Sequence, residues 1–262
     1  MQREDNSGDA HSMNERSTPT ADPLGYEPAE RVPEVRPKDG AIERGQPTRS
    51  QIYDRILDDV VSLRLKPGQP VSVKDIAAEF GVSRSPVREA VIRLTDAGFV
   101  EVYPQSGTRV APIRMDIVRR VYFVRTAIEM ALVEALAREH KPRHIVALRK
   151  IIGRQAKSAV NENVEQFYRL DEQFHEAIAE FVGHTGLWSS VESQRQHIDR
   201  LRRLILPQPA RLREIIAEHG AIVDCIEASD SEGARHAMTN HLSQVLKIQN
   251  ALKEKYREYF SP

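Results

Sequence analysis

The sequence lacks the features of exported and membrane-spanning proteins. Its 262 residues include a single cysteine, Cys225, so an intrachain disulfide is excluded and the chain is typical of a reducing compartment. No run of 18 or more apolar residues is free of charge, and the polar start MQREDNSGDA lacks the order of a secretory signal. We therefore expect a cytoplasmic protein that does not span a membrane.

The sequence also lacks a net charge, because basic and acidic residues both number 38. No global field therefore indicates a nucleic-acid partner, and such a partner has to be argued from local charge. Residues 1–47 hold six of the 15 prolines, 10 acidic and 6 basic side chains, and neither Phe nor Trp. A segment of this composition buries too little apolar surface to fold, so we expect a disordered arm. The other 215 residues then carry four excess positive charges.

Residues 48–112 have the order of elements of a winged helix-turn-helix. Apolar residues at helical spacing predict a helix over 49–65, and Ser72 precedes a short helix that ends at Phe80. A further helix follows a tight turn and stops before Gly98. The apolar period then changes from 3.6 to 2 over 99–103 and 108–111, which predicts a hairpin.

The second helix of such a motif presents its N-terminal side chains to the major groove. Arg84, Ser85 and Arg88 lie at that end of the helix, off the apolar face, and the two arginines are four residues apart. Each could fork onto a guanine edge or onto phosphate. Two surface arginines alone fit an ordinary solvated helix better than a DNA-binding one, but the whole ordered set of elements favours DNA binding.

Residues 81–110, GVSRSPVREAVIRLTDAGFVEVYPQSGTRV, resemble the winged helix-turn-helix of the GntR family of bacterial transcription regulators. The resemblance implies that double-stranded operator DNA is the partner. It also implies that DNA is contacted by a set comprising Arg84, Ser85, Arg88, the wing-tip glycine Gly107 and a basic residue on the preceding helix, here Lys74. Because lysine lacks the planar fork of arginine, we expect Lys74 to contact phosphate rather than a base.

The chain after Pro112 is almost wholly helical by periodicity. Short turn signals divide it into segments that we place at 115–139, 142–159, 162–182, 185–206, 209–228 and 231–258. Six helices of this length form an antiparallel bundle. The predicted fold class is mostly α: an N-terminal winged helix-turn-helix over 48–112 and a C-terminal antiparallel all-α bundle over 115–258.

Four ionisable residues interrupt apolar stripes in this bundle. Asp171 and His175 are four apart on one helix, and His219 and His241 each lie in the middle of an apolar face on two others. A lone buried histidine is commonly a satisfied core residue. Four such groups need partners because burying them unpaired is costly, and together they form the donor set of a metal site.

Arg125 lies on the apolar seam of segment 115–139. One interpretation is a surface pair with Glu129 at the i, i+4 spacing. The other is a clamp for a carboxylate, since one carboxylate and three neutral imidazoles leave a divalent site positively charged and Arg125 adds a further charge. The second interpretation predicts a small carboxylate effector.

Residues 115–250 resemble the FCD effector-binding domain of the FadR subgroup of GntR regulators. The likeness rests on the pattern VRTAIE that contains Arg125, on Asp171-Glu-Gln-Phe-His175, and on the histidines of Glu218-His219 and Asn240-His241-Leu242. It implies one divalent metal ion per chain and an Arg125 that faces the effector. The helix count is similar to that of the VanR-like six-helix branch, and an acyl-CoA effector is not expected.

Imidazoles with one carboxylate suit zinc, which we expect first, and also nickel, cobalt, iron or manganese. We further expect His197 and Gln194 to line the effector pocket. The sequence therefore predicts a homodimeric repressor that binds an operator and is controlled by a small organic acid at a metal site. Two alternatives stay open: a metal-dependent hydrolase or lyase, although no catalytic motif accompanies the donor set, and a regulator that senses the metal itself.

Overall fold

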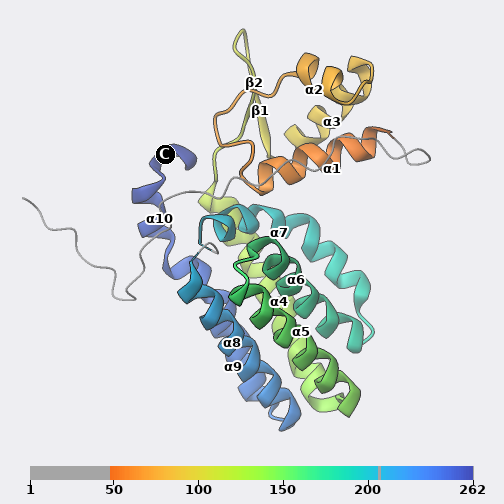
Figure 1. Cartoon of the computed structure of the whole chain (residues 1–262), viewed down its shortest axis with the longest axis vertical. Helices are drawn as coiled ribbons and strands as arrows, with labels where there is room; N and C mark the ends of the chain where they lie inside the picture. The colour runs from red at the N-terminus through yellow and green to blue at the C-terminus, as the bar shows by residue number, and fades with distance from the viewer. Residues whose placement is uncertain (1–47, 206–207, 262) are drawn as a thin grey trace, which may run out of the picture.

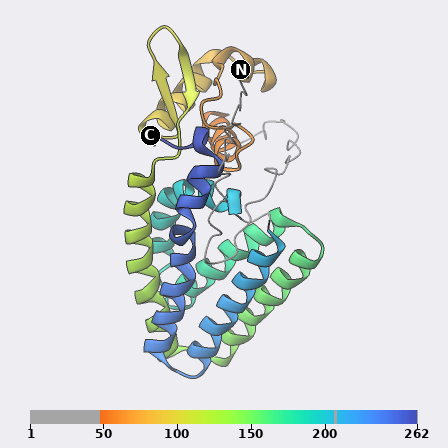
Figure 2. The same cartoon turned by 90° about the vertical axis from the view of Figure 1, so that its left-hand side faces the viewer.

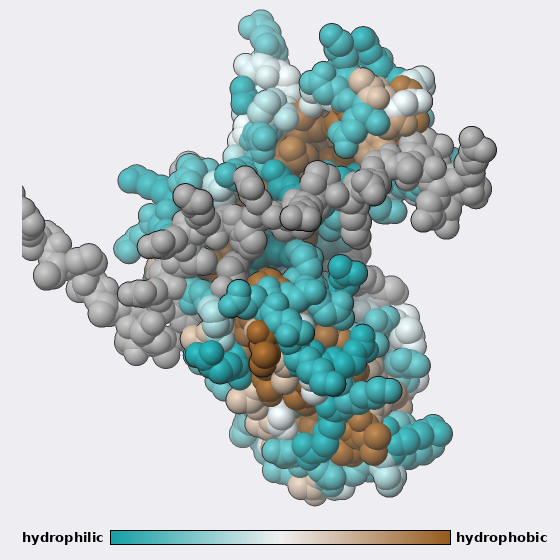
Figure 3. Space-filling view, viewed as in Figure 1, coloured by the Kyte–Doolittle hydropathy of each residue, from teal (hydrophilic) through white to brown (hydrophobic). Residues whose placement is uncertain are grey.

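The computed structural model describes residues 48–205 and 208–261, without the side chains of 48 and 189–194. The predicted arm over 1–47 lies outside the described residues. Figure 1 shows a small head above a long bundle of helices. The face drawn in Figure 3 is covered mainly by hydrophilic residues, as expected when the apolar faces of amphipathic helices pack inward.

The head is a winged helix-turn-helix, as predicted. Its elements in chain order are α1 (Thr48–Val61), α2 (Val73–Glu79), α3 (Arg84–Asp96), β1 (Val100–Tyr103) and β2 (Gly107–Val110). The side chain of Ser72 accepts a hydrogen bond from the backbone N–H of Asp75 and caps α2, as its position in the sequence indicates. The apolar face of α3 and Phe99 are buried in one core with α1.

The hairpin pairs β1 and β2 in antiparallel register, from Val100 opposite Val110 to Tyr103 opposite Gly107. Helix α1 ends four residues before the expected Leu65. The reason is tertiary packing: Leu63 adopts a left-handed φ of 63° and is 2% exposed, because its side chain joins an apolar cluster that lies between head and bundle. Packing at this junction therefore outweighs continued helical periodicity.

The bundle begins with α4 (Met115–Glu139), α5 (Pro142–Val160) and α6 (Val164–Phe181), and continues with α7 (Thr185–Ile205), α8 (Pro209–Glu227) and α9 (Ser231–Lys247). Helix α4 packs against α9 and α7, α5 packs against α6 and α8, and α8 packs against α9. The bundle interior lies between these helices. In the part of the chain that the structure describes, no helix is long and apolar enough to cross a bilayer.

The last predicted helix, 231–258, is wrong as one continuous element. It divides at Ile248 into α9 and α10 (Gln249–Lys255), and a 3-10 turn, η1 (Arg257–Tyr259), follows. The break buries Ile248, Leu252 and Tyr256 in the apolar cluster at the junction. Figure 2 shows the C-terminal segment reaching the base of the head. There Ile113, just after the hairpin, pairs with Phe260.

Candidate metal centre and DNA-binding surface

The four predicted metal ligands meet in the bundle interior. One donor atom from each of them lies within 4.8 Å of the others, and all four residues are buried: Asp171, His175, His219 and His241. Helix α6 supplies the first two from successive turns, α8 supplies the third and α9 the fourth. The Nε2 atom of His241 lies 3.2 Å from that of His175 and 3.4 Å from that of His219.

Each histidine of this centre turns its Nδ1 atom toward an oxygen acceptor. His175 Nδ1 lies 2.5 Å from Glu129 Oε2, His219 Nδ1 lies 2.9 Å from Gln155 Oε1, and His241 Nδ1 lies 2.7 Å from Glu218 Oε2. A carboxylate or amide oxygen only accepts, so His219 and His241 donate from Nδ1 and turn Nε2 toward the centre. The ring of His175 has the same orientation, with its Nε2 beside that of His241. This is the outer-shell arrangement that orients metal-bound histidines.

The surroundings of His175, His219 and Asp171 shift the pKa of each group downward. Burial lowers the pKa of His175, and burial together with His241 holds the pKa of His219 well below its ordinary value. Burial acts to raise the pKa of Asp171, but Arg202 and the three histidines outweigh it and the pKa lies below its ordinary range. The Oδ1 atom of Asp171 has no hydrogen-bond partner and lies 3.7 Å from His219 Nε2. Three lone pairs and a carboxylate oxygen thus converge, as around a cation.

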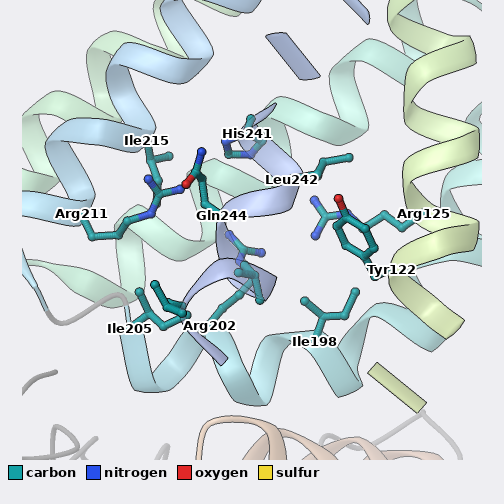
Figure 4. A pocket seen from close by; sticks show the side chains of 12 residues that line it. Tyr122, Arg125, Ile198, Arg202, Ile205, Arg211, Ile215, His241, Leu242 and Gln244 are labelled. Atoms are coloured by element: carbon teal, nitrogen blue, oxygen red, sulfur yellow. The ribbon is translucent and has the colours of Figure 1, made fainter. Parts of the chain in front are cut away.

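A narrow cavity of about 30 Å³ opens beside this centre, and His241 lines it. Figure 4 shows three arginines approaching it from different helices: Arg125 from α4, Arg202 from α7 and Arg211 from α8. Apolar side chains, with Tyr122 and Gln244, complete the wall. The three arginines and His241, a member of the candidate metal centre, all line the cavity. A molecule bound there would contact both the guanidinium groups and the candidate metal centre.

Each of the three arginines also forms an ion pair with a carboxylate that belongs to the centre or contacts one of its histidines. Arg125 pairs with Glu129, the partner of His175, and Arg202 pairs with Asp171 itself. Arg211 binds Glu218, the partner of His241, through two hydrogen bonds of 2.6 and 2.9 Å. The Arg125–Glu129 pair foreseen at i, i+4 spacing is therefore formed, but the arginine is 4% exposed and the carboxylate 2%. It is a buried pair at the cavity wall.

The structure corrects the expected place of His197. Its ring stacks on Phe99 of the head, with ring centroids 4.2 Å apart, and its Nε2 lies 3.0 Å from the carbonyl oxygen of Ala97. His197 is not among the residues that line the cavity, because Ile198 and Arg202 occupy the inward side of α7. The side chain of Gln194, expected beside it, lies outside the described residues.

Sequence reasoning missed the groups that support the ligands: Glu129, Gln155, Glu218, Arg202 and Arg211. A signal was present for two of them. Gln155 lies in register with Leu148 and Ile151 on the buried side of α5, and Glu218 directly precedes His219. Nothing in the local sequence around Arg202, on a helix rich in arginine, indicates that it reaches Asp171.

The predicted DNA-contacting residues lie on the surface of the head. Arg84, Ser85 and Arg88 are exposed in the first turns of α3, and Lys74 is exposed on α2. Gly107 is exposed at the start of β2 with a φ of 82°, which a side chain would strain. These positions leave the long side chains free to reach a duplex, and their contacts with DNA remain predictions.

Comparison with known proteins agrees with both parts of the fold. The profile of the gntR family of bacterial regulatory proteins matches residues 48–110, and that of the FCD domain matches residues 120–244. A transcriptional regulator from an unstable DNA locus of Streptomyces ambofaciens is 35% identical over 205 residues, which cover 78% of this chain and 86% of the relative. The transcriptional repressor RspR of Escherichia coli is 28% identical over 216 residues, which cover 82% and 95%.

Among solved structures, E. coli McbR/YncC has the same fold, with a TM-score of 0.66 and 22% identity over 80% of this chain and 99% of the other. The curated relatives are transcriptional regulators, not enzymes, and the hydrolase or lyase alternative finds no support among them. The chain therefore belongs to the gntR family of bacterial regulatory proteins, as an FCD-domain transcription regulator of the FadR subgroup.

Proposed function

We propose that this regulator is a cytoplasmic, homodimeric repressor whose hold on its operator depends on a divalent metal ion and a small carboxylate in the bundle. One observation carries the proposal. Three Nε2 lone pairs and the unpartnered Asp171 Oδ1 face one another in the interior. Donor atoms gathered in this way repel one another unless a cation lies between them.

The residues present fit such an ion. Asp171, His175, His219 and His241 would hold it, and four nitrogen and oxygen donors suit zinc, with nickel, cobalt, iron and manganese as further candidates. The protonated Nδ1 atoms would fix the three rings. When bound, the ion supplies positive charge and a Lewis-acidic position beside the cavity.

The cavity supports a small anionic effector. Arg125, Arg202 and Arg211 present guanidinium groups, which fork onto carboxylates, while Ile198 and Leu242 supply apolar contact. A volume of about 30 Å³ accommodates one or two waters, so an effector enters as arginine side chains move off the acids that they hold.

The head supports operator binding through α3. Arg84, Ser85 and Arg88 would contact the major groove, Lys74 the phosphates and Gly107 the backbone beside the wing. Two heads related by two-fold symmetry would match a palindromic site, and one head alone would bind weakly. RspR and the probable D-xylose utilization operon repressor of Paenarthrobacter nicotinovorans are named as repressors, which supports the same sign of action here.

The test is DNA binding by the full chain to the region upstream of its own gene, measured by fluorescence anisotropy. It is run without metal, with zinc, and with zinc plus a panel of small carboxylic acids. We expect zinc at one ion per chain and a carboxylate that weakens DNA binding only when zinc is present, by at least 5-fold, the lower end of usual coupling between sites.

Three results would decide against parts of this account. No stoichiometric metal would remove the metal centre. Release of DNA by zinc alone would make the metal the signal, as in the alternative that the sequence left open. An effect of a carboxylate that is equally large in zinc-free protein would separate the cavity from the metal centre.

A further inference from the structure

Helix α7 touches the head through the ring of His197. This ring lies parallel to that of Phe99, with an interplanar angle of 6°. The carbonyl oxygen of Ala97, the C-cap residue of α3, lies 3.0 Å from Nε2 and only accepts, so Nε2 donates the hydrogen bond. Burial lowers the pKa of His197 to about 4, which keeps the ring neutral with one fixed donor.

The same helix contacts the segment directly after β2 through Arg200, which is 1% exposed. Its Nη2 donates a hydrogen bond of 2.7 Å to the carbonyl oxygen of Ala111, and its Nη1 donates one of 3.5 Å to that of Pro112. Burial lowers its pKa to about 10, and no carboxylate among the described residues offsets that shift. A buried cation held by backbone carbonyls alone costs stability, so its value to the protein lies in what it positions.

The opposite side of α7 belongs to the cavity and the metal centre. Ile198, Arg202 and Ile205 line the cavity, and Arg202 pairs with Asp171. His197 and Arg200 are three positions apart and Ile198 and Arg202 are four apart, so one helix carries two distinct faces. A shift of the α7 backbone at Arg202 would therefore carry His197 and Arg200 with it.

We infer that His197 and Arg200 are positioning residues, and that α7 is the element through which the metal centre sets the orientation of the DNA-reading head. The inference rests on the proposed function for the ion that acts at Asp171. The two contacted residues directly follow the elements that would bind DNA. Ala97 follows α3, which would read the bases, and Ala111 follows β2, which forms part of the wing. Fixing both points fixes the head as a unit.

The experiment measures the head-to-bundle distance in the full chain by double electron–electron resonance. Spin labels are placed at Ile92→Cys on α3 and Val146→Cys on α5, sites that are 60% and 68% exposed, in a Cys225→Ser background. An excess of unlabelled chain ensures that each measured pair lies within one protein. Zinc content is determined on the same samples, with and without added zinc.

We expect one narrow distance in the parent that shifts when zinc is added. In His197→Phe, which keeps the stacked ring and loses the donor, and in Arg200→Met, the distribution should broaden at least twofold and the zinc-dependent shift should vanish. Zinc content should stay at one per chain. His197→Gln, which retains an N–H donor, should restore part of the narrow distribution.

His236→Phe and Arg138→Met serve as matched controls, because these side chains are exposed and lie away from the junction. A narrow distribution with an unchanged shift in both His197→Phe and Arg200→Met overturns the inference. Should the parent bind no zinc, the proposed function fails on that measurement alone, while the width of the distribution still tests the positioning role. Thermal unfolding separates loss of folding from loss of positioning, since Arg200→Met removes an unpaired buried charge and should not lower the melting temperature.

Discussion

The head and the bundle use arginine in opposite ways. Arg84 and Arg88 project from α3 into solvent, where their charge is available to a ligand from outside. Arg125, Arg202 and Arg211 are buried, and each already holds a carboxylate of the metal centre. An exposed arginine can therefore be removed with little effect on folding, whereas removing a buried one leaves an uncompensated acid. Function and stability are separable in the head and coupled in the bundle.

The largest effect expected in the bundle comes from His219→Ala. The substitution removes one of the converging donors and leaves Gln155 without its partner. Zinc content of the purified chain, measured by elemental analysis, should fall from one to well below one per chain. His236→Ala is the matched control because His236 is an exposed histidine on the same bundle. Equal zinc in the two variants would contradict the assigned ligand set.

In the head, Arg88→Ala should weaken specific DNA binding by about 1–3 kcal/mol, or roughly 5- to 150-fold. The melting temperature should change little, because the side chain is exposed. Anisotropy titration with operator DNA gives the affinity, and Arg138→Ala on the bundle controls for the loss of one positive charge. An unchanged affinity for Arg88→Ala would show that α3 does not enter the groove as proposed.

A smaller loss of zinc affinity is expected when a residue that only orients a proposed metal ligand is changed. Glu218→Gln keeps the shape of the side chain but weakens its bond to His241 and its pairing with Arg211. Loss of an outer-shell partner commonly costs 10- to 100-fold in metal affinity, so zinc should still bind, only less tightly. Competition with a chromogenic chelator measures this. An affinity equal to that of the parent would mean that Glu218 does not orient the ring.

The smallest effect lies at the junction and concerns pH. The pKa of His197 is lowered to about 4 by burial, whereas an unfolded histidine titrates near 6.5. Between these values the unfolded chain binds more protons, so this residue stabilises the fold above about pH 6.5 and loses that contribution as the pH falls toward 4. Between pH 7 and pH 5 the free energy of unfolding, measured with urea, should therefore fall by about 2 kcal/mol less in His197→Phe than in the parent. Parallel losses in the two proteins would refute the buried, neutral state of His197.

The architecture was largely accessible to sequence reasoning because periodicity, caps and turn residues act locally. Ser72 caps its helix, and the change of period after Gly98 marks the hairpin. Both errors at helix ends share one cause. The helices end early at Leu63 and Ile248 because both side chains are buried at the junction between head and bundle. Packing between segments that are distant in the sequence leaves no local signal.

The four residues of the donor cluster were also predictable, because a polar residue on an apolar stripe stands out in the sequence. Arg202, which pairs with Asp171, was not predictable, because the local sequence of the arginine-rich α7 does not indicate which helix its side chain contacts. His197 shows the same limit. It lies one residue from the cavity-lining Ile198, yet its ring stacks on the head instead, since neighbours on a helix point in different directions.

The most direct test of the account is X-ray absorption spectroscopy of the zinc-loaded full chain. The account predicts three imidazole nitrogens at about 2.0–2.1 Å and at least one oxygen around a single ion per chain. A sulfur ligand, which would implicate Cys225, or a shell of oxygen atoms without imidazole scattering would contradict the claim that Asp171, His175, His219 and His241 form a metal centre.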